Sequence, residues 1–448
     1  MERATLPWGV SLVKRKTEIV PYVNTREMPV IGQNREWNGT VPFTRAIQRG
    51  NKASLRGIGT LLLLALVALS LQGCLGIGGS KGQQVATGSN GQTVSVNTDV
   101  FKGKFYLTIN QNLYALSGNN TSQELVKTGN VADPAVSPDG KWVVFIQKYK
   151  QYSDLSVVST SGGKVRILLS GNGKFYNIGP YLHNTYIWYA QPEWSADGST
   201  LLFLSDVEKE AWYAQTTNAP MLDLQVFSIP FNNPTAKPND VAYAVFGDGG
   251  NRDESYRPGH PNQIIYTHYT YDAATRTQQQ IQLFMEDPNA ISTHPGTYHP
   301  GMPGTGFDPG IAITPTNADV IEPAFSPDGS AIAYIKRNAT DMSLEIMPTP
   351  PDSITTTPND PNTEKQATEM FTKDSSPFLT HQLYIEQPVW SPDGTQIAYI
   401  TYTNNAFDLW IVGVTHNVQK NTYAMKGSPI QVTSGGVDGA SRPVWRTS

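Results

Sequence analysis

The 448-residue chain contains one cysteine, Cys74, and only 16% of its residues are charged. A single cysteine permits no disulfide bond within the chain and no metal site built from several thiolates. Lysine and arginine number 33 against 37 aspartates and glutamates, a net charge of −4 at pH 7. This balance gives no overall basic field, so we expect no nucleic-acid partner.

The sequence also lacks an HExxH zinc motif, and its histidines are scattered rather than clustered. The seven are His183, His260, His268, His294, His299, His381 and His416. We therefore predict no catalytic residue, no metal and no cofactor. A protein that is not an enzyme is favoured, although an enzyme is not excluded.

The amino-terminal part carries the opposite charge to the rest of the chain. Residues 1–56 contain ten Lys or Arg and four Glu, net +6, which leaves −10 for the remainder of a chain whose total is −4. An apolar run follows in 57–73, with Leu61–Leu71 interrupted only by Ser70. A basic segment followed by an apolar run is typical of a secretory signal peptide, with 1–56 as its n-region and 57–73 as its h-region.

The residues Leu71-Gln72-Gly73-Cys74 resemble the bacterial lipobox. This resemblance implies cleavage before Cys74 and a diacylglycerol on its thiol, which would anchor the protein by lipid to the cell membrane on the extracytoplasmic side. The alternative is an uncleaved helix from Gly57 to about Gly79, just long enough to cross a bilayer. In that case 1–56 would be a cytoplasmic tail. Residues 74–102 are rich in Gly, Ser and Gln and are predicted to be a flexible tether.

Residues 103–448 carry a repeat. Four strong copies place a proline before an aromatic or apolar residue, then Ser-Pro-Asp-Gly or Ser-Ala-Asp-Gly, then an apolar run, at 133–140, 191–198, 322–329 and 387–394. Two degenerate copies lie at 257–262 and 442–445. Ser-Pro-Asp-Gly suits a type I turn, and the proline before it suits an edge strand. Further strand patterns follow in most copies, so each copy predicts a four-stranded meander.

Repeated meanders predict an all-β fold, a six-bladed β-propeller of four-stranded blades. The sixth blade begins at Arg442 but has only one strand before the chain ends. Its other three strands are predicted near the start of the repeat region, at 104–110, 112–117 and 123–128. We expect the carboxy-terminal strand to pair with these strands and close the ring. The apolar helix at the amino terminus would lie outside it.

The motif Pro-x-Trp-Ser-Pro-Asp-Gly followed by Ile-Ala-Tyr resembles the TolB-type, WD-like propeller repeat. The resemblance covers 103–448 and implies the fold more strongly than the function, because one fold hosts many functions. TolB itself is a periplasmic partner of the peptidoglycan-associated lipoprotein and has an α/β domain before its propeller. The tether at 74–102 has no counterpart of that domain.

Two sets of residues are candidate ligand sites. The residue before each repeat proline should lie at the mouth of the central channel: Asp133, Gln191, Arg257, Glu322, Gln387 and Arg442. These side chains either form ion pairs between blades, Arg442 with Asp133 and Arg257 with Glu322, or recognise a charged ligand. The second set is aromatic and lies in two loops expected on one face, where it either binds a ligand or packs the loops onto the ring: Tyr176, Tyr181, Tyr186, Trp188, Tyr189, Trp212 and Tyr213.

These features predict a membrane-tethered lipoprotein whose propeller is a binding or scaffold module. Its ligand would be a protein, a peptide or a glycan of the cell envelope, and we expect a monomer. One alternative is an exported hydrolase or lyase acting on peptide or polysaccharide. Another is a sensor domain on an uncleaved helix.

Overall fold

The computed structural model describes residues 82–88, 91, 93–178, 181–207, 224–244, 249–271, 277–287, 310–355 and 361–447, without the side chains of 175–184 and 361. The predicted n-region, the apolar segment and Cys74 lie outside these residues. Within the described ranges, no helix is both long and apolar enough to span a membrane.

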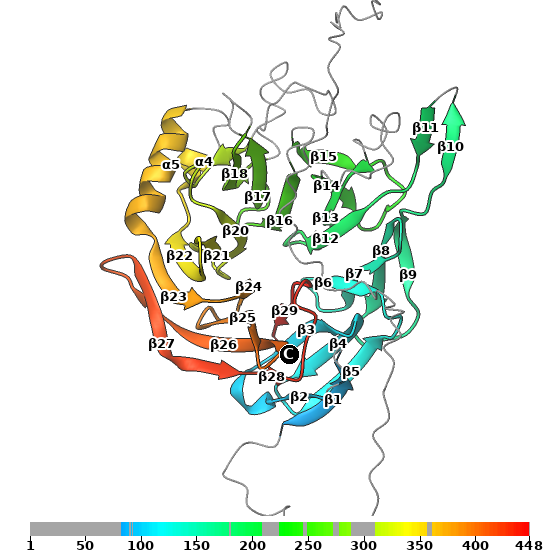
Figure 1. Ribbon diagram of the computed structural model, residues 1–448, viewed down its shortest axis with the longest axis horizontal. Helices are drawn as coiled ribbons and strands as arrows, with labels where there is room; N and C mark the ends of the chain where they lie inside the picture. Colours follow the sequence, from blue (N-terminus) through cyan, green and yellow to red (C-terminus); the bar gives the residue numbers. More distant parts are fainter. Residues whose placement is uncertain are drawn as a thin grey trace, which may run out of the picture. The chain divides into compact units, whose positions relative to one another are not determined.

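Six four-stranded antiparallel sheets surround a common axis (Figure 1). The first three blades are β6–β9 (Val131–Val136, Trp142–Lys148, Ser153–Ser159, Arg166–Ser170), β12–β15 (Tyr189–Trp194, Thr200–Ser205, Gln225–Pro230, Asn239–Ala242) and β16–β19 (Gly250–Tyr256, Ile264–Tyr271, Gln279–Glu286, Ile311–Ala312). The fourth and fifth are β20–β23 (Val320–Phe325, Ala331–Arg337, Met342–Pro348, Ser376–Gln382) and β24–β27 (Ile385–Trp390, Gln396–Thr403, Ala406–Asn417, Thr422–Gln431). The sixth joins β29 (Val444–Arg446) to β3, β4 and β5 (Lys104–Ile109, Asn112–Ser117, Thr121–Val126).

The predicted closure of the ring is confirmed. Strand β29 pairs antiparallel with β3, with Val444 opposite Tyr106 and Trp445 opposite Phe105. The indole Nε1 of Trp445 also donates a hydrogen bond to the Lys102 carbonyl oxygen at 2.8 Å. The last described strand therefore completes the blade that the first propeller strands begin.

The prediction of six blades is wrong, because a seventh sheet of the ring lies in the range expected to be tether. Strands β1 (Gln83–Thr87) and β2 (Thr93–Val96) form a three-stranded sheet with β28 (Thr433–Ser434), so the described residues form seven sheets of three or four strands. A short 3-10 helix, η1 (Thr98–Val100), leads from β2 toward β3. Val94 and Val96 are buried in a cluster with Phe105, which explains why this segment is ordered against the ring.

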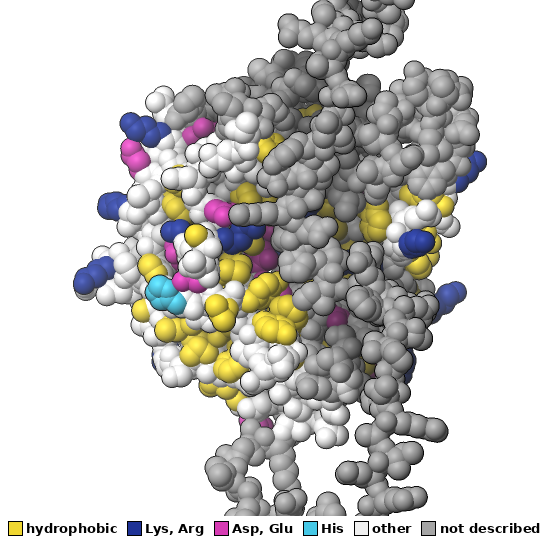
Figure 2. Space-filling model, viewed as in Figure 1, with side chains coloured by type: hydrophobic (Ala, Val, Ile, Leu, Met, Phe, Trp, Pro, Cys, Tyr) yellow, Lys and Arg dark blue, Asp and Glu magenta, His cyan; other side chains and the backbone are white. Residues whose placement is uncertain are grey.

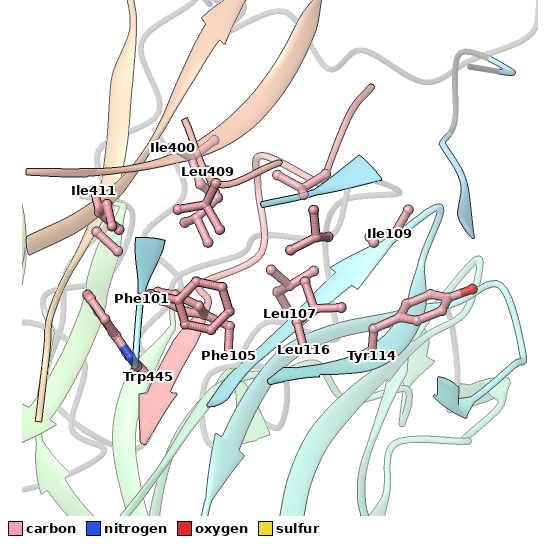
Figure 3. Close-up of a cluster of buried hydrophobic side chains, with 14 of the residues drawn as sticks. Phe101, Phe105, Leu107, Ile109, Tyr114, Leu116, Ile400, Leu409, Ile411 and Trp445 are labelled. Atoms are coloured by element: carbon pink, nitrogen blue, oxygen red, sulfur yellow. The ribbon is translucent and has the colours of Figure 1, made fainter. Parts of the chain in front are cut away.

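Apolar clusters fill the seams between neighbouring blades. Figure 3 shows the seam between blades five and six, where Phe105 and Leu107 of β3 meet Ile400 of β25 and Leu409 of β26. Alternating strand residues point into such seams because side chains of a strand face opposite sides of its sheet. Five further clusters lie at the other seams.

Tryptophans of the inner strands join one blade to the one before it. The Nε1 of Trp194 donates to the Ala135 carbonyl at 3.1 Å, and the Nε1 of Trp390 donates to the Ala324 carbonyl at 3.0 Å. Trp194 is 3% exposed and Trp390 is 6% exposed. The repeated tryptophan thus combines large apolar burial with a satisfied indole N–H.

The Ser-Pro-Asp-Gly turns form as predicted. In the first blade the N–H of Gly140 donates to the Ser137 carbonyl at 2.9 Å, and the Ser137 hydroxyl donates to Asp139 at 2.6 Å. Gly140 has φ of +69°, in the left-handed region that glycine adopts without strain. The same pattern recurs in blades two, four and five, which fixes all these turns on one face of the ring.

The elements outside the blades are insertions. The hairpin β10–β11 (Phe175–Ile178, Tyr181–Asn184) lies between blades one and two. Helices α4 (Asp352–Thr355) and α5 (Pro361–Asp374) lie between β22 and β23, where Ala367 and Phe371 of α5 pack into the seam between blades three and four.

Candidate functional site: a vestibule on the propeller axis

A cavity of about 470 Å³ opens on the side of the ring that carries the turns. Five of the six inner strands supply its walls, which places it on the axis. Its rim holds the turn residues Pro138, Ala196, Pro258, Pro327 and Pro392. Its charged and amide lining residues are Glu193, Asp253, Arg257, Glu322, Gln387, Arg442 and Arg446. We call this cavity the vestibule, and its volume lies in the range typical of ligand pockets.

A β-bulge aims the polar residues at the axis. In five blades the inner strand shifts register at the residue before the repeat proline or its equivalent. These residues have φ between +44° and +59°: Asp133, Gln191, Asp253, Glu322 and Gln387. A bulge leaves one residue unpaired in the ladder and turns its side chain out of the sheet. Proline tolerates the next position because it has no N–H to pair.

Hydrogen bonds connect these bulge residues from blade to blade. Gln191 Nε2 donates to Asp253 Oδ1 at 2.7 Å, and the Asp253 N–H donates to Gln191 Oε1 at 2.8 Å. The Thr267 hydroxyl then joins Asp253 Oδ2 at 3.0 Å to the Glu322 N–H at 3.2 Å. The Gln387 N–H donates to Glu322 Oε2 at 2.6 Å. These bonds form a fixed polar chain across blades two to five, and its members Asp253, Glu322 and Gln387 line the floor of the vestibule.

Arg442 lies in the sixth blade and reaches across the axis. Its Nη2 is 3.4 Å from Glu193 Oε2 in blade two, and its Nη1 donates to the Glu254 carbonyl oxygen in blade three at 3.3 Å. Burial alone would lower the pKa of this guanidinium, but the neighbouring acidic groups, Glu193 first among them, raise it above its ordinary value. Arg442 thus stays charged and links three blades at the centre of the ring.

Glu254 occupies the position that proline holds in the other blades. Its side chain is 0% exposed, and neither carboxyl oxygen has a hydrogen-bond partner. Burial raises the pKa of this carboxyl well above its usual value. The third blade therefore places an unpartnered carboxyl group next to the Arg442 guanidinium.

Two further carboxyl groups near the floor are also perturbed. Burial raises the pKa of Glu322 well above its usual value, and the charges of Asp253 and Glu386 add to the effect. Burial raises the pKa of Glu386 to about 7, against a hydrogen bond from the Tyr384 hydroxyl that lowers it. Like charges held close together in a low dielectric oppose ionisation.

Four of the six predicted mouth residues are bulge residues of the inner strands. Asp253 is a fifth bulge residue, and the sequence did not predict it. Asp133, Gln191, Glu322 and Gln387 are bulge residues, whereas Arg442 has the equivalent position without the positive φ. Glu322, Gln387 and Arg442 line the vestibule, but Asp133 and Gln191 are not among its lining residues. Asp133 is 5% exposed, and its N–H donates to the Ser441 hydroxyl.

Arg257 is not a bulge residue of its inner strand but belongs to the turn that follows the strand. Its N–H donates to the Gln263 carbonyl and its carbonyl accepts from His260, which are the bonds that Ser137 makes in the first blade. The degenerate copy at 257–262 therefore matches the repeat at the proline of its turn, whereas Asp253 occupies the bulge position of this blade. The predicted ion pairs also differ: Arg257 pairs with Asp352 of α4 at 2.8 Å, and Arg442 pairs with Glu193.

The predicted aromatic loops fall into three groups. Trp212 and Tyr213 lie outside the described residues, and so do the side chains of Tyr176 and Tyr181 in β10–β11. Tyr189 is 6% exposed and belongs to the core of blades one and two, and Trp188 packs against the next seam. Tyr186 stacks on Tyr152 with ring centroids 5.9 Å apart, and Tyr152 stacks on Tyr149 at 4.6 Å. The packing interpretation therefore holds for Trp188 and Tyr189.

Other apolar side chains are exposed. Leu383 is 90% exposed, and Tyr402, 47% exposed, contacts Phe407 with ring centroids 5.0 Å apart. Figure 2 shows hydrophobic side chains gathered beside a group of acidic and basic ones on the face that it draws. In the part of the chain that the structure describes, no group of three or more His, Cys, Asp or Glu could hold a metal ion.

Glu193, Asp253, Glu254 and Arg446 are polar residues of the site that sequence reasoning missed. One signal was available for blade three: Glu254-Ser255-Tyr256 has the spacing of Pro192-Glu193-Trp194. If Tyr256 is matched with Trp194, then Asp253 corresponds to Gln191, the bulge residue of blade two.

No protein-family model and no curated protein matches the chain. Solved structures do resemble it. TolB from Acinetobacter baumannii is 15% identical with a TM-score of 0.47, covering 77% of this chain and 67% of that one. Oligogalacturonate lyase from Vibrio parahaemolyticus is 11% identical with a TM-score of 0.39, covering 77% and 86%. Hydrazine synthase from Kuenenia stuttgartiensis is 14% identical with a TM-score of 0.40, covering 74% and 98%.

Proposed function

We propose that the chain is a peptide- or protein-binding module that holds its ligand in the vestibule, and that a lipid on Cys74 tethers it outside the cytoplasmic membrane. The observation that supports binding is the vestibule itself, an axial cavity with a fixed polar floor. Rigid, hydrogen-bonded walls reduce the ordering cost of binding.

The composition of the walls favours a polypeptide over a neutral sugar. The acidic residues Glu193 and Asp253 line the vestibule from blades two and three, while Arg442 and Arg446 line it from blade six. Charged groups of both signs suit the charged side chains and backbone of a peptide. The tryptophans at the walls are 3–6% exposed, so their ring faces are not available for stacking on a sugar.

Binding is tested by selecting random linear peptides displayed on phage against the full chain in detergent. Ala196 is exposed on the rim, so Ala196→Trp should obstruct the vestibule without disturbing the core. We expect enriched peptides that bind the wild-type chain and lose affinity for A196W. Failure to enrich any peptide, or equal affinity for both chains, would contradict the proposal.

The tether is tested separately by intact-mass spectrometry of the protein extracted from the membrane of its native host. The tether proposal expects a chain that begins at Cys74 and carries a lipid adduct. An unlipidated chain of 49.0 kDa would instead favour the uncleaved helix.

A further inference from the structure

A second cavity, of about 610 Å³, adjoins the vestibule. Its walls come from residues 99–103, which include the end of η1 and the residues after it, and from the blade-five turn at 391–396. It shares Pro392, Trp445 and Thr447 with the vestibule. We call it the seam cavity, because it lies where blade five meets the closing strand of blade six.

Of the three residues that the two cavities share, two are not buried. Thr447 is exposed and Pro392 is half-buried, whereas Trp445 is only 3% exposed. A ligand that fills the vestibule can therefore continue over Thr447 and Pro392 into the seam cavity without displacing a buried side chain.

The wall at 99–103 is held in place by several independent contacts. The Trp445 indole donates to the Lys102 carbonyl, and the Phe101 ring lies 4.9 Å from Phe105 and 6.4 Å from Trp445. Gly103 has φ of +86°, and a Cβ there would lie 2.2 Å from the Arg446 carbonyl oxygen. The seventh sheet fixes the start of this segment, so the wall is built before any ligand arrives.

We infer that the vestibule and the seam cavity form one continuous groove for an extended polypeptide segment, with a basic side chain of the ligand near Asp99 and Asp393. This inference rests on the proposed function and adds the length and the charge of the ligand. The seam cavity is lined by the carboxylates of Asp99 and Asp393 against one ammonium group, that of Lys102. The excess negative charge in its walls favours a ligand cation.

The first test uses one enriched peptide in two lengths, the full sequence and the shortest part that still depends on the vestibule in the A196W comparison. Calorimetry with the full chain in detergent measures both affinities. We expect the T447W chain to bind the long peptide no more tightly than the wild-type chain binds the short one. The added indole would block the passage from the vestibule into the seam cavity. Thr380→Trp, at an exposed threonine of β23 outside both cavities, should leave both affinities unchanged.

The second test is the charge. Asp99→Asn should weaken binding of the long peptide about two- to fivefold, the range of an exposed ion pair, and leave the short peptide unaffected. Replacing the peptide's basic residue by alanine should abolish the difference between the D99N and wild-type chains. Glu369→Gln, on the exposed face of α5, is the matched control.

The outcomes separate the two ideas. If T447W and D99N bind the long peptide as the wild-type chain does, while A196W does not, the continuous groove is wrong and the binding function stands. If no peptide depends on Ala196, the proposed function fails and the groove fails with it. Binding of oligosaccharides, but not of peptides, that T447W abolishes would also overturn the inference.

Discussion

Glu254 offers a direct test of the electrostatics at the centre of the ring. Its carboxyl group is buried without a hydrogen-bond partner, in the place that proline takes in the other blades. A buried polar group without a partner costs about 1–3 kcal/mol. Leucine has a similar size and no polar atoms, so Glu254→Leu should raise the free energy of unfolding by about 1–3 kcal/mol near pH 7.

The sign of the pH dependence follows from the raised pKa of Glu254. In the unfolded chain this carboxyl ionises near its ordinary pKa of 4.5, whereas in the folded chain it keeps its proton to higher pH. The destabilising effect of Glu254 is therefore smallest below about pH 4.5 and increases as the pH rises toward the folded pKa. The advantage of E254L should be smallest near pH 4, where only the unpaired polar atoms count, and should grow toward pH 7.

Urea unfolding of the full chain at several pH values measures this difference, with the slope m checked for equality between variants. Glu369→Gln on α5, which replaces an exposed carboxylate, should change stability little at any pH. A loss of stability in E254L near pH 7, larger than about 1 kcal/mol, would refute the reasoning. It would mean that Glu254 is ionised and that its attraction to Arg442 outweighs the cost of burial.

Three further outcomes are expected. Trp194→Phe keeps a buried ring but loses the hydrogen bond to Ala135, so urea unfolding should show a loss of about 1–3 kcal/mol from the unpaired carbonyl. Gly103→Ala introduces a Cβ against the Arg446 carbonyl at a positive φ, and the midpoint of thermal unfolding should fall. In Asp197 the hydrogen bond from Ser195 lowers the carboxyl pKa to about 2, so its contribution to stability is lost as the pH falls from about 4 to about 2. Asp197→Asn should flatten the acid limb of the unfolding profile in that window, and an unchanged limb would contradict this assignment.

The sequence by itself determined the parts of the structure that depend on local chemistry. Ser137-Pro138-Asp139-Gly140 and its equivalents specify a turn through a fixed φ, a side-chain hydrogen bond and a glycine, so spacing alone located four blades. The single strand after Arg442 was enough to predict that the ring closes, because an isolated strand has to pair with other strands to bury its side chains. Blade three shows the limit of this reasoning: Pro258 matched the repeat by residue type, but it belongs to the turn.

Only the tertiary structure decided which residues meet on the axis. Arg442 reaches Glu193 across 249 residues of sequence, and no local pattern encodes that distance. Strands β1 and β2 form because β2 pairs with β28 and because their apolar side chains are buried against the ring. The polar composition of this segment had predicted a tether instead. Tyr189 is apolar core because strand register turned it inward. Register and closure are properties of the assembled ring, and they set the shape and charge of the vestibule.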